Sequence, residues 1–162
     1  MLDAIQAVRQ NHALEHATIH VLSRRCPTVA LVGRTTPSGF VLYGQVDTAA
    51  VADAAAEALL RLATGERHLA VHPRCGTNLV VVGMVAGLAG FVGGWGPSRS
   101  RLERLPLALS AAIVGAVVGQ PLARLVQQHV TTSASVEGVT IDSVSRQEMG
   151  RLVAHHIVLR RA

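Results

Sequence analysis

Residues 78–95 read NLVVVGMVAGLAGFVGGW, and this stretch decides the fold class. No charged residue occurs between Arg74 and Arg99. Because a helix rises ~1.5 Å per residue, the segment would be roughly 27 Å long, close to the hydrocarbon thickness of a bilayer. The stretch therefore predicts a helix that crosses a membrane.

A second apolar stretch, LPLALSAAIVGAVVGQPLA, follows at residues 105–123 and also lacks charged residues. It is less apolar, since it holds two prolines, Ser110 and Gln120. The connector at residues 96–101 is short and turn-forming, so we expect an antiparallel hairpin of two membrane helices. A buried hairpin of a soluble protein is the alternative, and it is disfavoured because so short a chain could hardly cover both stretches.

Small residues recur at intervals of four in both stretches, which gives each helix a smooth face for close packing in lipid. These residues are Gly83, Gly87, Gly90 and Gly94 in the first stretch and Ala111, Gly115 and Gly119 in the second. We expect these faces to join the two helices, or to contact a second copy of the chain or another membrane protein.

The composition also suits a membrane protein. Apolar residues make up 49% of the chain and aromatic residues only 2%, whereas a soluble core usually contains several large rings. The net charge of +5 comes from arginine, with no lysine present. Because no aromatic-interleaved basic stripe, zinc-finger spacing or helix-turn-helix pattern occurs, we expect the lipid bilayer, and not nucleic acid, as the anionic partner.

The flanking segments, residues 1–76 and 125–162, are predicted to form one small α+β headpiece on a transmembrane hairpin at residues 77–124. The expected elements are a helix over 2–25, a β-hairpin of strands 29–32 and 40–43 with a loop longer than two residues, a helix from Asp47 or Thr48 to about Thr64, a short strand over 68–71, a strand over 139–141, and a short helix or helix–strand unit over 146–158.

The location is predicted to be the bacterial inner membrane, with the headpiece in the cytoplasm. The chain starts without a basic segment followed by an apolar one, so no cleaved signal peptide is expected. Arg99, Arg101 and Arg104 in and after the connector oppose this orientation under the positive-inside rule. Arginines near the other end of the hairpin roughly balance them.

The clearest chemical signature is NHALEHATIH at residues 11–20. On a helix, His12, His16 and His20 fall along one stripe with Glu15 beside it. His12-x-x-Glu15-His16 has the inverted-zincin spacing, in which two histidines one turn apart bind zinc and the glutamate acts as general base. We predict His12 and His16 as metal ligands and Glu15 as the catalytic residue. A polar helix face without metal is the alternative.

A second constellation, HPRC, occupies residues 72–75. His72 and Cys75 are three residues apart and could bind one ion, and the N-terminus of the following helix would favour the thiolate. The alternative is an ordinary turn into the membrane with Arg74 as an interfacial anchor. The expected ion is zinc, with iron as the second choice. The four histidines outside these motifs, namely His68, His129, His155 and His156, are interpreted as ordinary surface or interface residues.

The two motifs together resemble the paired signatures of the YqhQ-like family, bacterial membrane proteins of unknown function described as metal-dependent enzymes. The family pattern is H-x-x-E-H-x-T-I, then H-P-R-C-G-T-S and directly a membrane span. Asn78 stands at the serine position, and the chain is shorter with fewer spans, so it looks like a shortened relative. The resemblance implies one metal site shared by both motifs.

Three functions are compatible with these patterns. The first is metal-assisted hydrolysis at the membrane surface, with Glu15 activating water on an ion held by His12, His16 and His72 or Cys75. The second is a non-enzymatic membrane assembly or scaffold factor with a closed, structural four-ligand site. The third is such a factor with a histidine-rich polar network and no metal. The sequence identifies no substrate.

Overall fold

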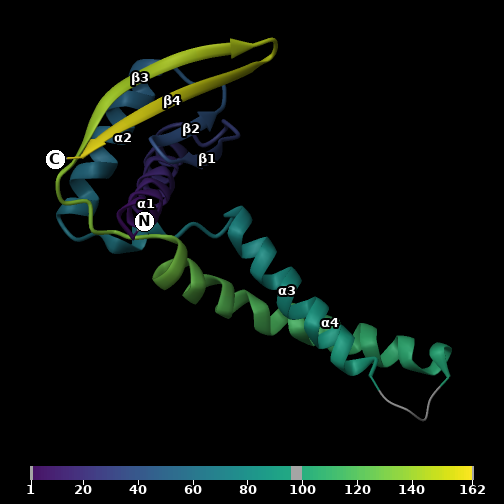
Figure 1. The fold of residues 1–162 in the computed structure, drawn as a ribbon. Helices are drawn as coiled ribbons and strands as arrows, with labels where there is room; N and C mark the ends of the chain where they lie inside the picture. The colour runs from purple at the N-terminus through teal and green to yellow at the C-terminus, as the bar shows by residue number, and fades with distance from the viewer. Residues whose placement is uncertain (1, 96–99, 162) are drawn as a thin grey trace. The chain divides into compact units, whose positions relative to one another are not determined.

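The computed structural model describes residues 2–95 and 100–161 of an α+β chain (Figure 1). Its contacts divide the chain into two compact units. The headpiece contains the residues up to His72 together with those from Val130 onward, and the helical hairpin runs from Pro73 to His129. The predicted connector lies largely outside the described residues, because 96–99 are not among them.

Helices and strands make up most of the residues that the structure describes. In chain order they are α1 (Leu2–Arg25), β1 (Val32–Thr36), β2 (Gly39–Tyr43), α2 (Thr48–Ala63), the 3₁₀ helix η1 (Arg67–Ala70), α3 (Gly76–Gly93), α4 (Arg101–Val126), the π-helical segment η2 (Gln127–Thr131), β3 (Val139–Met149) and β4 (Leu152–Arg161).

Helices α1 and α2 have the extents that the sequence predicts. No glycine or proline interrupts α1, and Cys26 leaves the helix because the following Pro27 disfavours helical angles at the residue before it. Helix α2 ends at Ala63, and Gly65 continues the chain at a φ of +99°, a conformation that favours glycine.

The four strands form one antiparallel sheet in the order β1-β2-β4-β3. The strand pair β2–β4 joins the part of the headpiece before the hairpin to the part after it, with Phe40 opposite Ile157. Helices α1 and α2 pack on this sheet and on one another (Figure 1). The core between them is aliphatic apart from Phe40, and its fully buried members include Leu14, Leu22, Leu42 and Val51.

The first strand lies later in the chain than predicted. Strand β1 covers Val32–Thr36, and Thr36 pairs with Gly39, so the turn contains only Pro37 and Ser38. The prediction of a loop longer than two residues was wrong because it followed hydrophobicity. An edge strand tolerates polar residues, and the threonines of β1 are β-branched.

Two further predictions of secondary structure were also wrong. Residues 67–70 form η1 instead of a strand, with local backbone bonds such as Leu69 N–H to Glu66 O at 3.1 Å. The short helix, or helix–strand unit, that was predicted over 146–158 contains no helix: it belongs to the ribbon of β3 and β4, in which Met149 pairs with Leu152. Gly150 makes the tight turn because its φ is +64°, which side chains disfavour.

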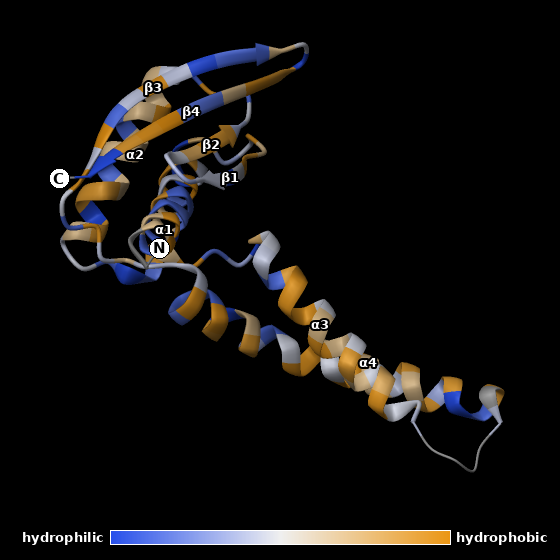
Figure 2. Cartoon of the chain, in the orientation of Figure 1, coloured by the Kyte–Doolittle hydropathy of each residue, from blue (hydrophilic) through white to orange (hydrophobic). Residues whose placement is uncertain are grey.

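Helices α3 and α4 are long and apolar enough to cross a membrane (Figure 2). Helix α4 is longer than the predicted apolar stretch, because it begins at Arg101 with Ser100 as its cap. The Ser100 hydroxyl accepts a hydrogen bond from the Glu103 N–H at 3.3 Å. Many large apolar side chains of both helices are exposed, among them Met84, Leu88 and Ile113, a surface that water disfavours.

Only part of the predicted small-residue faces lies where the two helices of the hairpin meet, and Gly93, which was not among the predicted residues, lies there too. A Cβ atom at Gly93 would lie 2.6 Å from Ala111 Cβ, and one at Gly115 would lie 2.7 Å from Ala89 Cβ. The helix backbones therefore approach too closely for side chains at these positions. At Gly83 and Gly87, in contrast, a Cβ would meet no atom within 4 Å, so these two glycines do not serve this pairing.

Candidate metal centre

Four imidazoles of the headpiece gather beside α1. His12, His16 and His20 come from successive turns of the helix, and His72 comes from the segment just after η1. The ring centres are 4.3 Å apart for His12 and His16, 5.7 Å for His16 and His72, and 4.9 Å for His20 and His72. The structure thus brings residues from both sequence motifs together within one unit.

In each of the three α1 histidines, one ring nitrogen forms a hydrogen bond with a backbone carbonyl oxygen. His12 Nδ1 lies 3.0 Å from Thr131 O, His16 Nδ1 lies 2.8 Å from Ala70 O, and His20 Nε2 lies 3.0 Å from Val71 O. A carbonyl oxygen can only accept, so each of these nitrogens carries the proton. In a neutral imidazole the other nitrogen then offers a lone pair, which is the arrangement of metal-binding histidines with their supporting hydrogen bonds.

The backbone that supplies these carbonyls is positioned by buried side chains. Leu69 and Ala70 of η1 are buried in the headpiece core, which fixes the segment that carries the carbonyls of Ala70 and Val71. Residue His72 precedes Pro73 and therefore favours an extended backbone.

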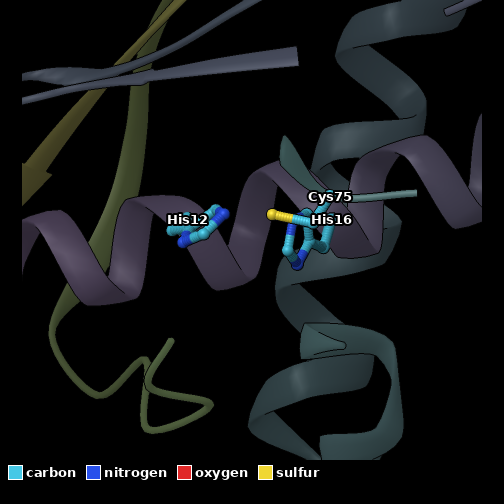
Figure 3. A group of neighbouring side chains, drawn as sticks. All are labelled: His12, His16 and Cys75. Carbon is cyan, nitrogen blue, oxygen red and sulfur yellow. The ribbon is translucent and has the colours of Figure 1, made fainter. Parts of the chain in front are cut away.

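His12 and His16 of the headpiece and Cys75 at the start of the hairpin are of residue types that bind metal ions, and Figure 3 draws their side chains. The two imidazoles come from the headpiece, whereas Cys75 is the N-cap residue of α3 in the hairpin unit. Cys75 follows His72 by three residues, so their Cα atoms are at most about 11 Å apart whatever the arrangement of the units. The thiol is therefore tethered near the histidine cluster by the chain itself.

Glu15 is held by the first strand of the sheet. Its carboxylate is buried and accepts a hydrogen bond from the Thr35 hydroxyl at 2.5 Å. A Cβ at Gly33 would lie only 2.2 Å from Glu15 Oε1, so the strand backbone passes directly against the carboxylate. The predicted catalytic residue is thus firmly positioned, and its role as a base stays a prediction.

His20 belongs to the cluster of imidazoles, but it was not among the predicted metal ligands. The sequence places it on the same helical stripe as His12 and His16, and this spacing was the signal by which it could have been included. Three other histidines of the headpiece have different surroundings: His68 is exposed, His155 is buried beside Thr48, and His156 is 3.1 Å from Gln147 Oε1.

Comparison with known proteins identifies relatives without an assigned activity. The model of a domain of unknown function, DUF6391, matches residues 7–144. An uncharacterized protein of the cyanobacterium Picosynechococcus sp. (strain ATCC 27264 / PCC 7002 / PR-6) is 40% identical over 136 residues, which cover 78% of this chain. The chain spans 66% of the length of that relative, just under two thirds. No solved structure matches.

Proposed function

The chain belongs to the DUF6391 family, and on that premise we propose that it is a metal-binding protein of the bacterial membrane that acts as a metal-dependent hydrolase. The observation that carries the proposal is the pairing of His12, His16 and His20 with backbone carbonyls. Such a hydrogen bond orients the ring, and it is the usual support of a histidine that binds a metal ion through its other nitrogen.

The proposed ion is zinc, held by His12, His16 and Cys75, with iron as the second choice. Two imidazoles and one thiolate are a ligand set that zinc accepts, and three protein ligands leave one position for water. The resemblance of the two sequence motifs to those of the YqhQ-like family supports this proposal, because the motifs contain His12, His16 and Cys75.

Glu15 is the proposed general base, since it follows His12 by three residues and directly precedes His16 on α1. It would accept the proton that is released when water adds to the carbonyl or phosphoryl centre of a substrate, and an ion at His12, His16 and Cys75 would supply the Lewis-acid chemistry for that reaction. The proton would then pass to the leaving group, so one water is consumed for each bond cleaved. Hydrogen bonding from Thr35 keeps the carboxylate in one orientation during these steps.

The proposed location follows from the hairpin. Helices α3 and α4 would cross the inner membrane as a pair, and the lipid would cover their exposed apolar side chains. The segments before α3 and after α4 would then emerge on the same side, where they form the headpiece, which we assign to the cytoplasm.

A structural metal site in a non-enzymatic assembly factor is the second candidate. It is favoured by the distance of 5.7 Å between the ring centres of His16 and His72, because His72 as a fourth ligand would close the site. A closed site would leave no position for water.

The test is metal content by mass spectrometry on the full chain purified in detergent. Wild type should carry zinc or iron in stoichiometric amount, and His16→Ala and Cys75→Ser should each lose it. His68→Ala is the matched control, because this histidine is exposed and should leave the metal content unchanged. A metal-free wild type whose thermal midpoint does not respond to added zinc would refute the metal site.

The catalytic role has its own test. Glu15→Gln should keep the metal and lose hydrolysis in a screen of ester, peptide and phosphoester substrates. Wild type without activity toward any of these, together with loss of the metal in His72→Ala, would favour the structural site.

A further inference from the structure

The row of imidazoles along α1 is longer than one ion can use. His12 and His20 are eight residues apart, which corresponds to a rise of about 12 Å along the helix. A zinc ion binds imidazole nitrogens at only ~2.0–2.1 Å, and two histidines one turn apart are the usual helical pair. The first position, with His12 and His16, therefore leaves His20 unused.

His20 has a partner of its own at the distance that a shared ion requires. Two imidazoles on one tetrahedral ion, each bound at ~2.0–2.1 Å, have ring centres roughly 5 Å apart. The ring centres of His20 and His72 are 4.9 Å apart with the planes at 59°, whereas His16 and His72 are 5.7 Å apart. The His72 ring is thus better matched to His20 than to the first position.

The hydrogen bonding of His20 supports the same assignment. Its Nε2 donates to Val71 O at 3.0 Å, so the nitrogen with the lone pair is Nδ1. The carbonyl belongs to the residue directly before His72, so the same short backbone segment orients one ring and carries the other. Both side chains are half-buried, so solvent reaches part of each residue.

From this geometry we propose a second metal position, held by His20 and His72 and completed by water, next to the position of His12, His16 and Cys75. The inference rests on the proposed metal centre and extends it to two ions. In two-metal hydrolases, one ion generates the nucleophile and the other stabilises the leaving oxygen, and phosphoesters and peptides are the usual substrates. The second ion therefore assigns the proposed hydrolase to this substrate class.

The experiment is an equilibrium titration of the metal-free, detergent-purified full chain with zinc, followed by measurement of bound metal per chain. Wild type should bind two ions, the second more weakly because it has only two protein ligands. His20→Ala should bind one. His20→Gln serves as a second variant with a polar side chain of similar length, and His156→Ala is the matched control, which should still bind two.

Cobalt provides an independent readout of which position is lost. A thiolate ligand gives a charge-transfer band that an imidazole-only position lacks, so His20→Ala should keep this band at full intensity while its total cobalt falls from two ions to one. One ion per chain in wild type, unchanged in both His20 variants, would overturn the second position and leave the proposed function intact. No bound metal in wild type would refute both.

Discussion

Gly33 shows how a single residue can control the position of Glu15. A Cβ at this glycine would lie 2.2 Å from Glu15 Oε1 and 2.7 Å from its Cγ, far inside van der Waals contact. We expect Gly33→Ala to destabilise the protein by about 1–3 kcal/mol, the usual cost of overpacking. Chemical or thermal unfolding of the purified variant measures this loss.

A double-mutant cycle isolates the cause of that loss. In a Glu15→Ala background the clashing atoms are gone, so adding Gly33→Ala should cost much less than it does in wild type. An equal cost in both backgrounds would mean that Gly33 is required for some other reason.

Burial of His155 predicts a pH dependence of stability that is separate from the proposed metal centre. Its side chain is fully buried on β4, and burial lowers the pKa of the imidazole below its usual value near 6.5. The folded state then prefers the neutral ring, so the unfolded chain binds more protons when the pH falls below that usual value. Stability contributed by neutral His155 is present above about pH 6.5 and declines as the pH falls.

The measurement compares thermal midpoints at pH 7.5 and pH 5.5 for wild type, His155→Gln and His156→Gln. The midpoint of His155→Gln should fall less between the two pH values than that of wild type. His156→Gln should behave as wild type does, because this ring is only half-buried beside Gln147. Equal falls in all three proteins would show that His155 does not govern the acid sensitivity.

Residue spacing predicted part of the candidate site and could not predict the rest. The i, i+4 interval of His12 and His16 needs only a helix, and α1 is one. The carbonyls of Ala70, Val71 and Thr131 come from segments more than fifty residues away along the chain, so no local pattern identifies them as hydrogen-bond partners. For the same reason the proximity of His20 to His72 required the structure.

At the scale of elements, helices were predicted better than strands, for a physical reason. Helices are delimited by local signals, such as Pro27 after α1 and Gly65 after α2. Strand β1 and the long ribbon of β3 and β4 are stabilised by pairing with distant segments. Their polar, exposed residues, such as Arg146 and Glu148, give no hydrophobic signal.

The hairpin yields a prediction at this scale. Gly115→Val should destabilise the protein in detergent by about 1–3 kcal/mol or more, because the new side chain would meet Ala89 Cβ, Val85 O and Ala86 Cα at 2.7–3.0 Å. Gly83→Val is the matched control, since a Cβ there meets nothing within 4 Å. Thermal unfolding followed by circular dichroism measures both, and equal midpoints would contradict the packing described for α3 and α4.

For the whole molecule, the sequence predicted that the segments before and after the hairpin form one headpiece, but it did not predict that their strands share one sheet. Two antiparallel apolar helices return the chain to its starting side, which is why a joint headpiece was expected. The pairing of Phe40 with Ile157 could not be read from that argument, because strand register depends on turn geometry and on which face is buried. Arg161 also joins the ends, with hydrogen bonds to Ala7 O at 3.0 Å and to Asn11 Oδ1.

The proposed membrane arrangement leads to a prediction for the whole molecule. Met84 lies in the middle of α3 with 69% of its side chain exposed, and His68 lies in the headpiece and is also exposed. In a background of Cys26→Ala and Cys75→Ser, Met84→Cys should resist a membrane-impermeant maleimide in native membranes until detergent is added, since hydrocarbon excludes the reagent. His68→Cys should react in inverted membrane vesicles and stay unlabelled in intact cells, if the headpiece is cytoplasmic. Rapid labelling of Met84→Cys in native membranes would mean that water reaches the middle of α3 and would contradict the membrane span. Labelling of His68→Cys in intact cells would show that the headpiece lies outside the cytoplasm, with the hairpin still in the bilayer.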